Sequence, residues 1–328
     1  MLRWGILSTA KIGMEHVIPA LLDAENCTIA AIASRDKSRA EAVAERFAIP
    51  HAFGSYDAML ESDLIDAVYI PLLTSQHVEW SIRAANAGKH VLCEKPIALQ
   101  AQQIDAIIEA RDTNKVLVSE AFMVTYHPQW LKVRDLLAEG AIGILKHVQA
   151  AFTYNNTDPD NMRNILSQGG GALPDIGVYP TVATRFVTQC EPLSVSAKVE
   201  RNATTGTDNY ASWRADFGSF EMSAYVATEM ALRQEISFHG DEGWIALTAP
   251  FNAGLYDADT VFLYDKDHEE TRQFRFPGVN QYRMEVEAFA RSVAGEDQEI
   301  FSLESSINNQ KLIDAIYRAG ESGMWEDV

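Results

Sequence analysis

The sequence has few cysteines and no long apolar segment, and both absences narrow the class of protein. Cys27, Cys93 and Cys190 are its three cysteines, and no two form a Cys-x-x-Cys pair. A disulfide framework or a cysteine zinc site is therefore not expected. No apolar run approaches the ~20 residues that span a bilayer, and a strand-like segment begins at Met1, where a signal peptide would otherwise lie. We expect a cytoplasmic protein with free, buried thiols and no membrane partner.

Positive charge is also scarce. Lys and Arg total 27 against 46 Asp and Glu, which gives a net charge of -19. Such a surface favours solubility and opposes binding to a polyphosphate backbone, so a nucleic acid partner is not expected. No His, Cys or carboxylate cluster has metal-ligand spacing, and we expect no metal. The 328 residues, 47% of them hydrophobic, suffice for two domains with separate cores.

Repeats, low-complexity tracts and Ser/Gly-rich linkers are absent from the sequence. The domain organisation is therefore inferred from the spacing of the apolar residues alone. In the first ~120 residues, β-rich runs alternate with helical segments, the pattern of a parallel sheet built from βαβ units. The predicted strands are 2–7, 28–33, 67–70, 90–92 and 116–118. The apolar stripes of two predicted helices are Ala40, Val43, Ala44 and Phe47, then Val78, Ser81, Ile82 and Ala85. Pro19 falls inside the first crossover, where an interior proline would kink a helix.

The alternation of strand-like and helical segments ends after about Met123. Strand-like runs follow one another from Val195 to Phe276 and predict an antiparallel sheet with one buried face. The alternating apolar residues are Ala211, Trp213, Ala215 and Phe217, then Met222, Ala224 and Val226. A C-terminal helix with Leu312, Ala315, Ile316 and Ala319 on one stripe could cover part of either domain. The predicted fold is α/β, with a dinucleotide-binding domain at 1–120 and an α+β domain at 121–328.

The turn after the first strand is a candidate nucleotide site. Ser8, Ala10 and Gly13 occupy the three positions of a Gly-x-Gly-x-x-Gly fingerprint, and only the last is glycine. Small residues still let the backbone approach a pyrophosphate at a helix N-terminus. The alternative is a tight strand-to-helix turn without a ligand. The predicted contacts in this turn are Ser8, Thr9, Ala10, Lys11, Ile12 and Gly13.

The end of the second strand bears on cofactor choice. Ser34, Arg35 and Asp36 lie about 20 residues beyond the turn, where the adenosine ribose is recognised. A guanidinium at Arg35 can pair with a 2′-phosphate, which favours NADP. Asp36 leaves NAD possible, because a carboxylate there could accept the ribose hydroxyls. A solvated surface arginine is the structural alternative.

Three blocks in order carry a family resemblance. They are YIPLLTSQHVEWSIRAANAGKHVLCEKP from Tyr69, EAFMVTYHPQ at 120–129 and GGGALPDIGVYP at 169–180. The chain resembles the glucose-fructose oxidoreductase, inositol dehydrogenase and rhizopine-catabolism (Gfo/Idh/MocA) family over essentially its whole length. Its closest likeness is to the dihydrodiol and aldose dehydrogenase branch. The resemblance implies a Rossmann domain, then an open-faced, mainly antiparallel α+β domain, with the active site in the cleft between them. Family likeness and a sheet face that needs cover both predict a homodimer or larger oligomer.

The resemblance also implies a catalytic set. Lys95 matches the lysine of the Glu-Lys-Pro motif, whose proline usually follows a cis peptide bond, and Asp175 and Tyr179 match the second-domain motif. A spacing of four places Asp175 and Tyr179 on one helix face. Tyr179 is the expected acid/base, with its phenol made more acidic by the Lys95 ammonium, because an unassisted alcohol is too weak an acid at neutral pH. Asp175 would orient the substrate hydroxyl or Lys95.

Further contacts are expected within these blocks and at Arg163, just before the glycine run. The remaining expected cofactor contacts are Leu72, Thr74, His77, Glu94 and Lys95. The expected substrate contacts are Lys95, Tyr126, Arg163, Asp175 and Tyr179. Arg163 could instead cap a loop, and His77 and His127 could be hydrogen-bonded structural histidines.

Some positions depart from the family pattern. Thr74 stands where many members have asparagine, and Val124 and Thr125 replace a Tyr-Arg pair. These departures weaken the dihydrodiol or aldose assignment and leave the reaction type intact. The expected function is NAD(P)-dependent hydride transfer at a hydroxyl-bearing carbon of a sugar, polyol or cyclic diol. The alternatives are an NAD-dependent glycosidase of the same family and a non-catalytic cofactor-binding sensor.

Overall fold

The computed structural model describes residues 1–255 and 258–328, and the chain forms two compact units. The first contains Met1–Met123 and Gln281–Ile307, and the second contains Val124–Asn280 and Asn308–Val328. The sequence had placed all of 121–328 in the second domain, so 281–307 differs from that expectation. The reason is packing, because Val286 and Phe289 are buried in the same core as Trp4 and Ile29.

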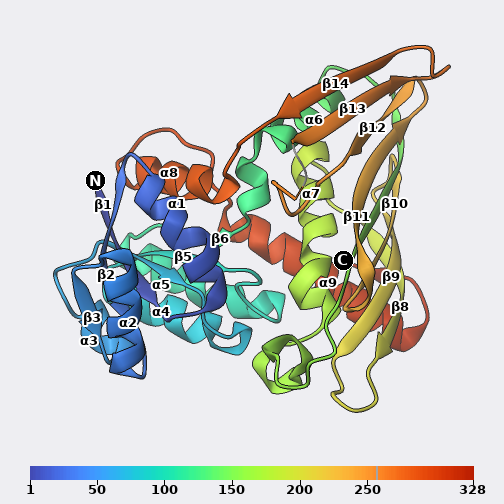
Figure 1. The fold of residues 1–328 in the computed structure, drawn as a ribbon. Helices are drawn as coiled ribbons and strands as arrows, with labels where there is room; N and C mark the ends of the chain where they lie inside the picture. The colour runs from blue at the N-terminus through green and yellow to red at the C-terminus, as the bar shows by residue number, and fades with distance from the viewer. Residues whose placement is uncertain (256–257) are drawn as a thin grey trace. The chain divides into compact units, whose positions relative to one another are not determined.

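A parallel sheet forms the centre of the first unit (Figure 1). Its strands are β1 (Leu2–Leu7), β2 (Cys27–Ala33), β3 (His51–Phe53), β4 (Ala67–Ile70), β5 (His90–Glu94) and β6 (Val118–Ala121). They lie in the order β3-β2-β1-β4-β5-β6, and every neighbouring pair is parallel. The order reverses between β1 and β4, which is where doubly wound folds bind ligands beyond the carboxyl ends of the strands. β1 and β4 have the predicted bounds, β3 was not predicted, and β6 begins where the last predicted strand ended.

Helices flank this sheet. They are α1 (Ile18–Asp23), α2 (Lys37–Phe47), α3 (Tyr56–Leu60), α4 (His77–Asn86), α5 (Ile104–Asn114) and α8 (Gln281–Val293), with short 3-10 turns η2 (Thr74–Gln76) and η3 (Ala101–Gln103). Pro19 does not break the first crossover. A π-helical segment, η1 (Gly13–Val17), precedes α1, and Pro19 is the second residue of α1, directly after this irregular segment.

The second unit contains a mainly antiparallel sheet. Its strands are β7 (Leu145–Asn155), β8 (Ser194–Arg201), β9 (Asp208–Asp216), β10 (Glu221–Ala227), β11 (Glu229–Gly240), β12 (Gly243–Leu247), β13 (Asp259–Asp265), β14 (Thr271–Phe276) and β15 (Glu326–Asp327). The order is β14-β13-β12-β11-β7-β10-β9-β8-β15. Only the β7–β10 pair is parallel among the strand pairs of the described residues in this sheet. The predicted buried alternation in β9 and β10 is confirmed, whereas β7 was not predicted.

Helices α6 (Pro128–Ala138) and α7 (Val178–Thr188) lie on one face of this sheet (Figure 1). The remaining short helices are η4 (Met123–Tyr126), η5 (Met162–Asn164), η6 (Leu166–Gln168) and η7 (Leu173–Gly177). Helix α9 (Leu303–Ser322) begins in the first unit and continues in the second from Asn308, with the predicted apolar stripe buried. Within the described chain, no helix is long and apolar enough to cross a membrane.

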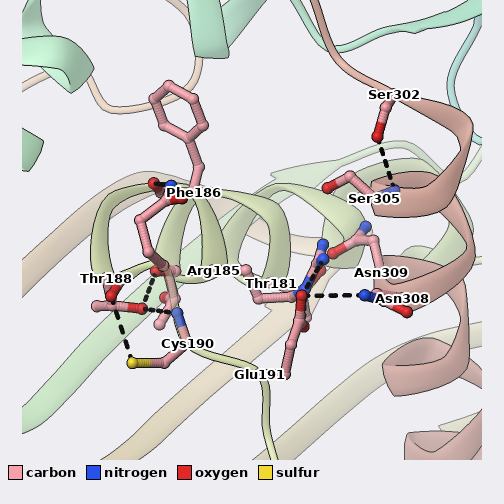
Figure 2. A network of polar contacts seen from close by, with 12 residues as sticks. Thr181, Arg185, Phe186, Thr188, Cys190, Glu191, Ser302, Ser305, Asn308 and Asn309 are labelled. Atoms are coloured by element: carbon pink, nitrogen blue, oxygen red, sulfur yellow. Dashed lines mark hydrogen bonds and ion pairs between the residues drawn. The ribbon is translucent and has the colours of Figure 1, made fainter.

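An ion pair between the buried Arg185 and the exposed Glu191 lies at the C-terminal end of α7 (Figure 2). Nε and Nη2 of Arg185 donate to the two carboxylate oxygens of Glu191 at 2.6 and 2.8 Å. The amide of Asn308 donates to the same carboxylate at 3.1 Å. Arg185 is only 5% exposed, whereas the Glu191 side chain is 52% exposed, so the pair holds a buried cation against a carboxylate at the surface. The network therefore ties α7 to the α9 segment of the same unit.

Candidate active site

The turn after β1 lies at the point where the strand order reverses. Ser8 has a φ of 128°, and its Oγ donates to the carbonyl of Pro71 at 3.3 Å and accepts from the amide of Ala10 at 3.2 Å. The helix begins just after Ala10, whose carbonyl accepts from the amide of Met14. The amides of the first helical turn, from Lys11 to Gly13, therefore face the helix N-terminus, where an anion binds favourably.

The protein's own packing does not require glycine at position 13. A Cβ at Gly13 would lie 3.6 Å from Pro71 and Tyr69, an ordinary contact distance. The residue is nevertheless buried at the start of the helix. The absence of a side chain leaves the backbone open to close approach, which fits a dinucleotide pyrophosphate.

The structure separates the roles of Arg35 and Asp36 at the end of β2. Asp36 is the N-cap of α2, and its Oδ1 accepts from the amide of Ser38 at 2.9 Å and from the Ser38 hydroxyl at 2.7 Å. These bonds lower the pKa of Asp36. Arg35 is exposed beside Ser34, whose Oγ accepts from the amide of Asp36. Asp36 therefore has a structural role as the cap of α2, and the Arg35 side chain is exposed directly beside it.

His77 is fully buried between two backbone carbonyls. Its Nδ1 lies 2.8 Å from the carbonyl oxygen of Pro96, and its Nε2 lies 3.0 Å from that of Leu72. Burial lowers its pKa, and the nearby charge of Lys95 lowers it further. The ring therefore holds the segments after β4 and β5, including the cis Lys95–Pro96 peptide, which supports the structural alternative for His77. Thr74 is buried in η2, directly before this histidine.

Tyr69, Tyr282 and Glu285 form a largely buried cluster with Glu94. This cluster was not predicted from the sequence. The Tyr69 hydroxyl donates to Oε1 of Glu94 at 2.6 Å. Glu285, from α8, is 1% exposed, and its Oε1 has no hydrogen-bond partner among the residues that the structure describes. Burial, and then the charge of Glu94, raise the pKa of Glu285 well above its usual value, and the same two causes raise that of Tyr282. The available signal was a glutamate four residues before Phe289, on the apolar side of α8.

Asp175 lies in the π-helical segment η7, and Tyr179 follows in the first turn of α7. Oδ2 of Asp175 accepts from the Tyr154 hydroxyl at 2.6 Å and lies 2.9 Å from Nε of Arg163. Asp175 is the main cause of the raised pKa of Arg163, and burial with Asp175 raises that of Tyr154. Tyr154, at the end of β7, was not predicted, because nothing local distinguishes it from other strand tyrosines.

Tyr179 is packed in an aromatic environment. Its ring centroid lies 5.7 Å from that of Phe152 and 5.8 Å from that of Phe251. Its phenol is also among the groups that raise the pKa of Arg163. The guanidinium thus acts on both Asp175 and Tyr179, and the amide of Arg163 is itself capped by the side chain of Asn161 at 3.1 Å. This favours a site contact over a loop cap as the role of Arg163.

The segment that carries the departures from the family pattern is buried. Val124, Thr125 and Tyr126 lie in η4, each 8% exposed or less. Nδ1 of His127 accepts from the amide of Gln129 at 3.1 Å, and its Nε2 lies 3.2 Å from Oδ2 of Asp259. His127 therefore fits its structural alternative as the N-cap of α6. Lys95 belongs to the first unit and Tyr179 to the second.

The comparisons with known proteins match both parts of the chain. The model of the oxidoreductase family with an NAD-binding Rossmann fold matches residues 2–122, and that of the GFO/IDH/MocA C-terminal domain matches residues 130–246. D-xylose 1-dehydrogenase (NADP(+)) 2 of Haloferax volcanii is 34% identical over 98% of each chain. Trans-1,2-dihydrobenzene-1,2-diol dehydrogenase of Xenopus laevis is 32% identical over 75% of this chain and 74% of that one.

A solved structure has a similar fold over nearly the whole chain. A 3-ketoreductase from Actinomadura kijaniata, in complex with NADP and TDP-benzene, is 30% identical with a TM-score of 0.90, covering 97% of each chain. The predicted fold class, a Rossmann domain followed by a mainly antiparallel domain, is confirmed. The chain belongs to the Gfo/Idh/MocA family of oxidoreductases.

Proposed function

We propose that this oxidoreductase uses NADP to interconvert an alcohol and a carbonyl on a sugar, polyol or cyclic diol. The observation that carries the proposal is the cluster around Asp175, in which one carboxylate oxygen meets Tyr154 and Arg163 beside Tyr179. Relatives named for xylose, dihydrodiol and keto-sugar chemistry support the substrate class.

The cofactor proposal rests on the first unit. When bound, NADP supplies the nicotinamide that accepts or donates the hydride. The amides from Lys11 to Gly13 would hold the pyrophosphate, and Arg35 would pair with the 2′-phosphate. Leu72, Thr74 and Glu94 would line the adjoining strand ends, with His77 keeping that backbone in place.

The proton is handled by the protein. During oxidation the Tyr179 phenolate would take the proton of the substrate hydroxyl and become a neutral phenol, and during reduction the phenol would donate that proton. The Lys95 ammonium would stabilise the phenolate form, and Arg163, in the second unit with Tyr179, would add a second positive charge. Asp175, held by Tyr154 and Arg163, would accept a hydrogen bond from a substrate hydroxyl. The rings of Phe152 and Phe251 limit water around the tyrosine, which strengthens these charge interactions.

Turnover of single and double variants tests the proton-handling step. Tyr179→Phe should lower kcat by about 10²–10⁴, the usual contribution of a positioned acid/base, with NADP affinity nearly unchanged. Lys95→Met should have a similar effect. Because both residues act on one proton, the double variant should lose much less than the product of the single losses.

Matched measurements make this test decisive. Tyr210→Phe, on the sheet away from the site, should keep full turnover. Retention of most turnover by Tyr179→Phe would transfer the acid/base role elsewhere. Net absorbance change at 340 nm distinguishes the alternatives: a dehydrogenase accumulates NADPH with substrate, a glycosidase accumulates product without it, and a sensor binds NADP without turnover.

We further propose a cytoplasmic homodimer that pairs through the helix-free face of the antiparallel sheet. A hollow of about 410 Å³ on the sheet is lined in part by Tyr210, Ser212, Ser223 and Tyr225. Arg214 pairs with Glu221 on neighbouring strands, so two copies could exchange such ion pairs across a two-fold axis. The cytoplasm suits the three free cysteines, of which Cys27 and Cys93 are buried.

A further inference from the structure

A buried aspartate in β9 meets the start of the helix that carries Asp175 and Tyr179. Asp208 is 1% exposed, and its Oδ2 accepts from the amide of Leu173 at 2.7 Å. Its Oδ1 accepts from the hydroxyl of Tyr317, in α9, at 2.6 Å. Strand, helix start and C-terminal helix therefore converge on a single carboxylate, all within the second unit.

This contact replaces the usual local cap. Helices leave their first amides without intrahelical partners, and a side chain just before the helix normally accepts from one of them. Ala172 holds that position in η7 and offers no side-chain acceptor. The acceptor comes instead from 35 residues further along the chain, as a carboxylate, whose charge also favours a helix N-terminus.

Glycine at position 171 is what permits this approach. Gly171 has a φ of 143°, and a Cβ there would overlap Oδ1 of Asp208. Any side chain would therefore push the carboxylate off Leu173 or displace the helix start. The carbonyl of Gly171 accepts from the amide of Asp175 at 3.2 Å, so such a displacement reaches the functional carboxylate directly.

We propose that Asp208 and Tyr317 are positioning residues that fix Asp175 and Tyr179 by capping their helix from a distance. The inference rests on the proposed function in one respect, that Asp175 and Tyr179 carry the chemistry. Misplacement of a reacting group by about 1 Å can cost about 10²-fold in rate, so the cap matters without touching substrate. Burial raises the pKa of Asp208, and its hydrogen bonds from Tyr317 and Leu173 oppose that rise.

The test uses the full-length protein with Tyr317→Phe, Asp208→Asn and Gly171→Ala, and Tyr210→Phe as control. Tyr317→Phe removes one hydroxyl, and kcat should fall about 10-fold with Kd for NADP within twofold of wild type. Gly171→Ala should fall about 100-fold. Asp208→Asn retains the size and one acceptor, and should fall less than Gly171→Ala. Hydrogen exchange of the peptide 171–180 should quicken in all three and stay unchanged in the control.

Each result decides the question. Quicker exchange confined to 171–180 together with lower kcat supports the positioning role. Unchanged exchange, or quicker exchange with wild-type kcat, overturns it. A wild-type protein without NADP-dependent turnover would refute the proposed function instead, and the ionisation of Tyr179, followed by ultraviolet difference against Tyr179→Phe, would then show whether the cap variants disturb this helix. No disturbance there would overturn the inference as well.

Discussion

The protonation of the buried Glu285 should make the free energy of unfolding depend on pH. Its carboxyl group is enclosed near the Glu94 charge, and its raised pKa keeps it protonated in the folded protein while it ionises in the unfolded chain above its usual value near 4.5. The free energy of unfolding should therefore fall as pH rises above 4.5, by about 1.4 kcal/mol per pH unit until the folded-state pKa is reached. Glu285→Gln should remove this decline. Urea unfolding from pH 4.5 to 8 measures it.

The exposed Glu41, on α2, supplies the comparison. Glu41→Gln should track wild type across the same pH range, because the Glu41 side chain is exposed on the surface of α2. Parallel curves for wild type and Glu285→Gln would show that Glu285 is already ionised in the folded protein.

Arg35 gives a prediction on cofactor choice. Replacing Arg35→Ala should weaken NADP binding by roughly 1–3 kcal/mol, the scale of a charge-assisted contact, and change NAD binding little. Titrations with each cofactor measure the difference. Asp36→Asn is a suitable comparison, since Asp36 caps α2 and should affect both cofactors equally. Equal losses of NADP and NAD on Arg35→Ala would show that the guanidinium does not meet the 2′-phosphate.

The residues predicted from sequence are those that lie in linear motifs. Lys95, Asp175 and Tyr179 stand at fixed places in recognisable blocks. Tyr154 and Glu285 lie in no such motif. Tyr154 is identified by its hydrogen bond to Asp175, 21 residues further along the chain, and Glu285 by the charge of Glu94, in a distant segment. Local pattern reports which face of an element is buried, and it does not report which distant side chain shares that space.

At the scale of elements, the segment with Arg163 is held by close backbone contact. A Cβ at Gly170 would overlap the carbonyl oxygen of Arg163. Gly170→Ala should therefore destabilise the protein by more than about 1 kcal/mol and lower kcat, because Arg163 would move away from Asp175. Gly88→Ala, at a left-handed position with open space around it, should cost about 1–2 kcal/mol from its backbone conformation alone and leave kcat unchanged. Urea unfolding and steady-state kinetics measure both, and equal behaviour of the two variants would contradict this account.

Elements with strong burial patterns were the predictable ones. β1 and β4 are almost wholly buried, and their continuous apolar runs gave the observed bounds. β3 has three residues, too few for a period, and the 281–307 segment was misplaced. The apolar stripe of α8 indicates that one face must be covered. It does not indicate that the partner is the first unit's core, from which the chain had departed more than 150 residues earlier.

At the scale of the whole molecule, the strong negative charge opposes association, so a dimer needs a surface with favourable contacts of its own. The face described above carries paired charges and stacked tyrosines, with Tyr210 and Tyr225 ring centroids 6.4 Å apart. A standard interface buries about 800 Å² on each partner, which a broad sheet face can provide.

This surface yields the last prediction. Light scattering at micromolar concentration should give twice the chain mass of 36.4 kDa. Ser212 lies between Lys198 and Tyr225 in the strand register, so Ser212→Arg places a long cation in the middle of the face. That variant should be a monomer with an unchanged circular dichroism spectrum, because a partly exposed strand position accommodates arginine without touching the core. Thr113→Arg, on an exposed position of α5, should remain a dimer. A dimer that survives Ser212→Arg would mean that the subunits associate through another surface.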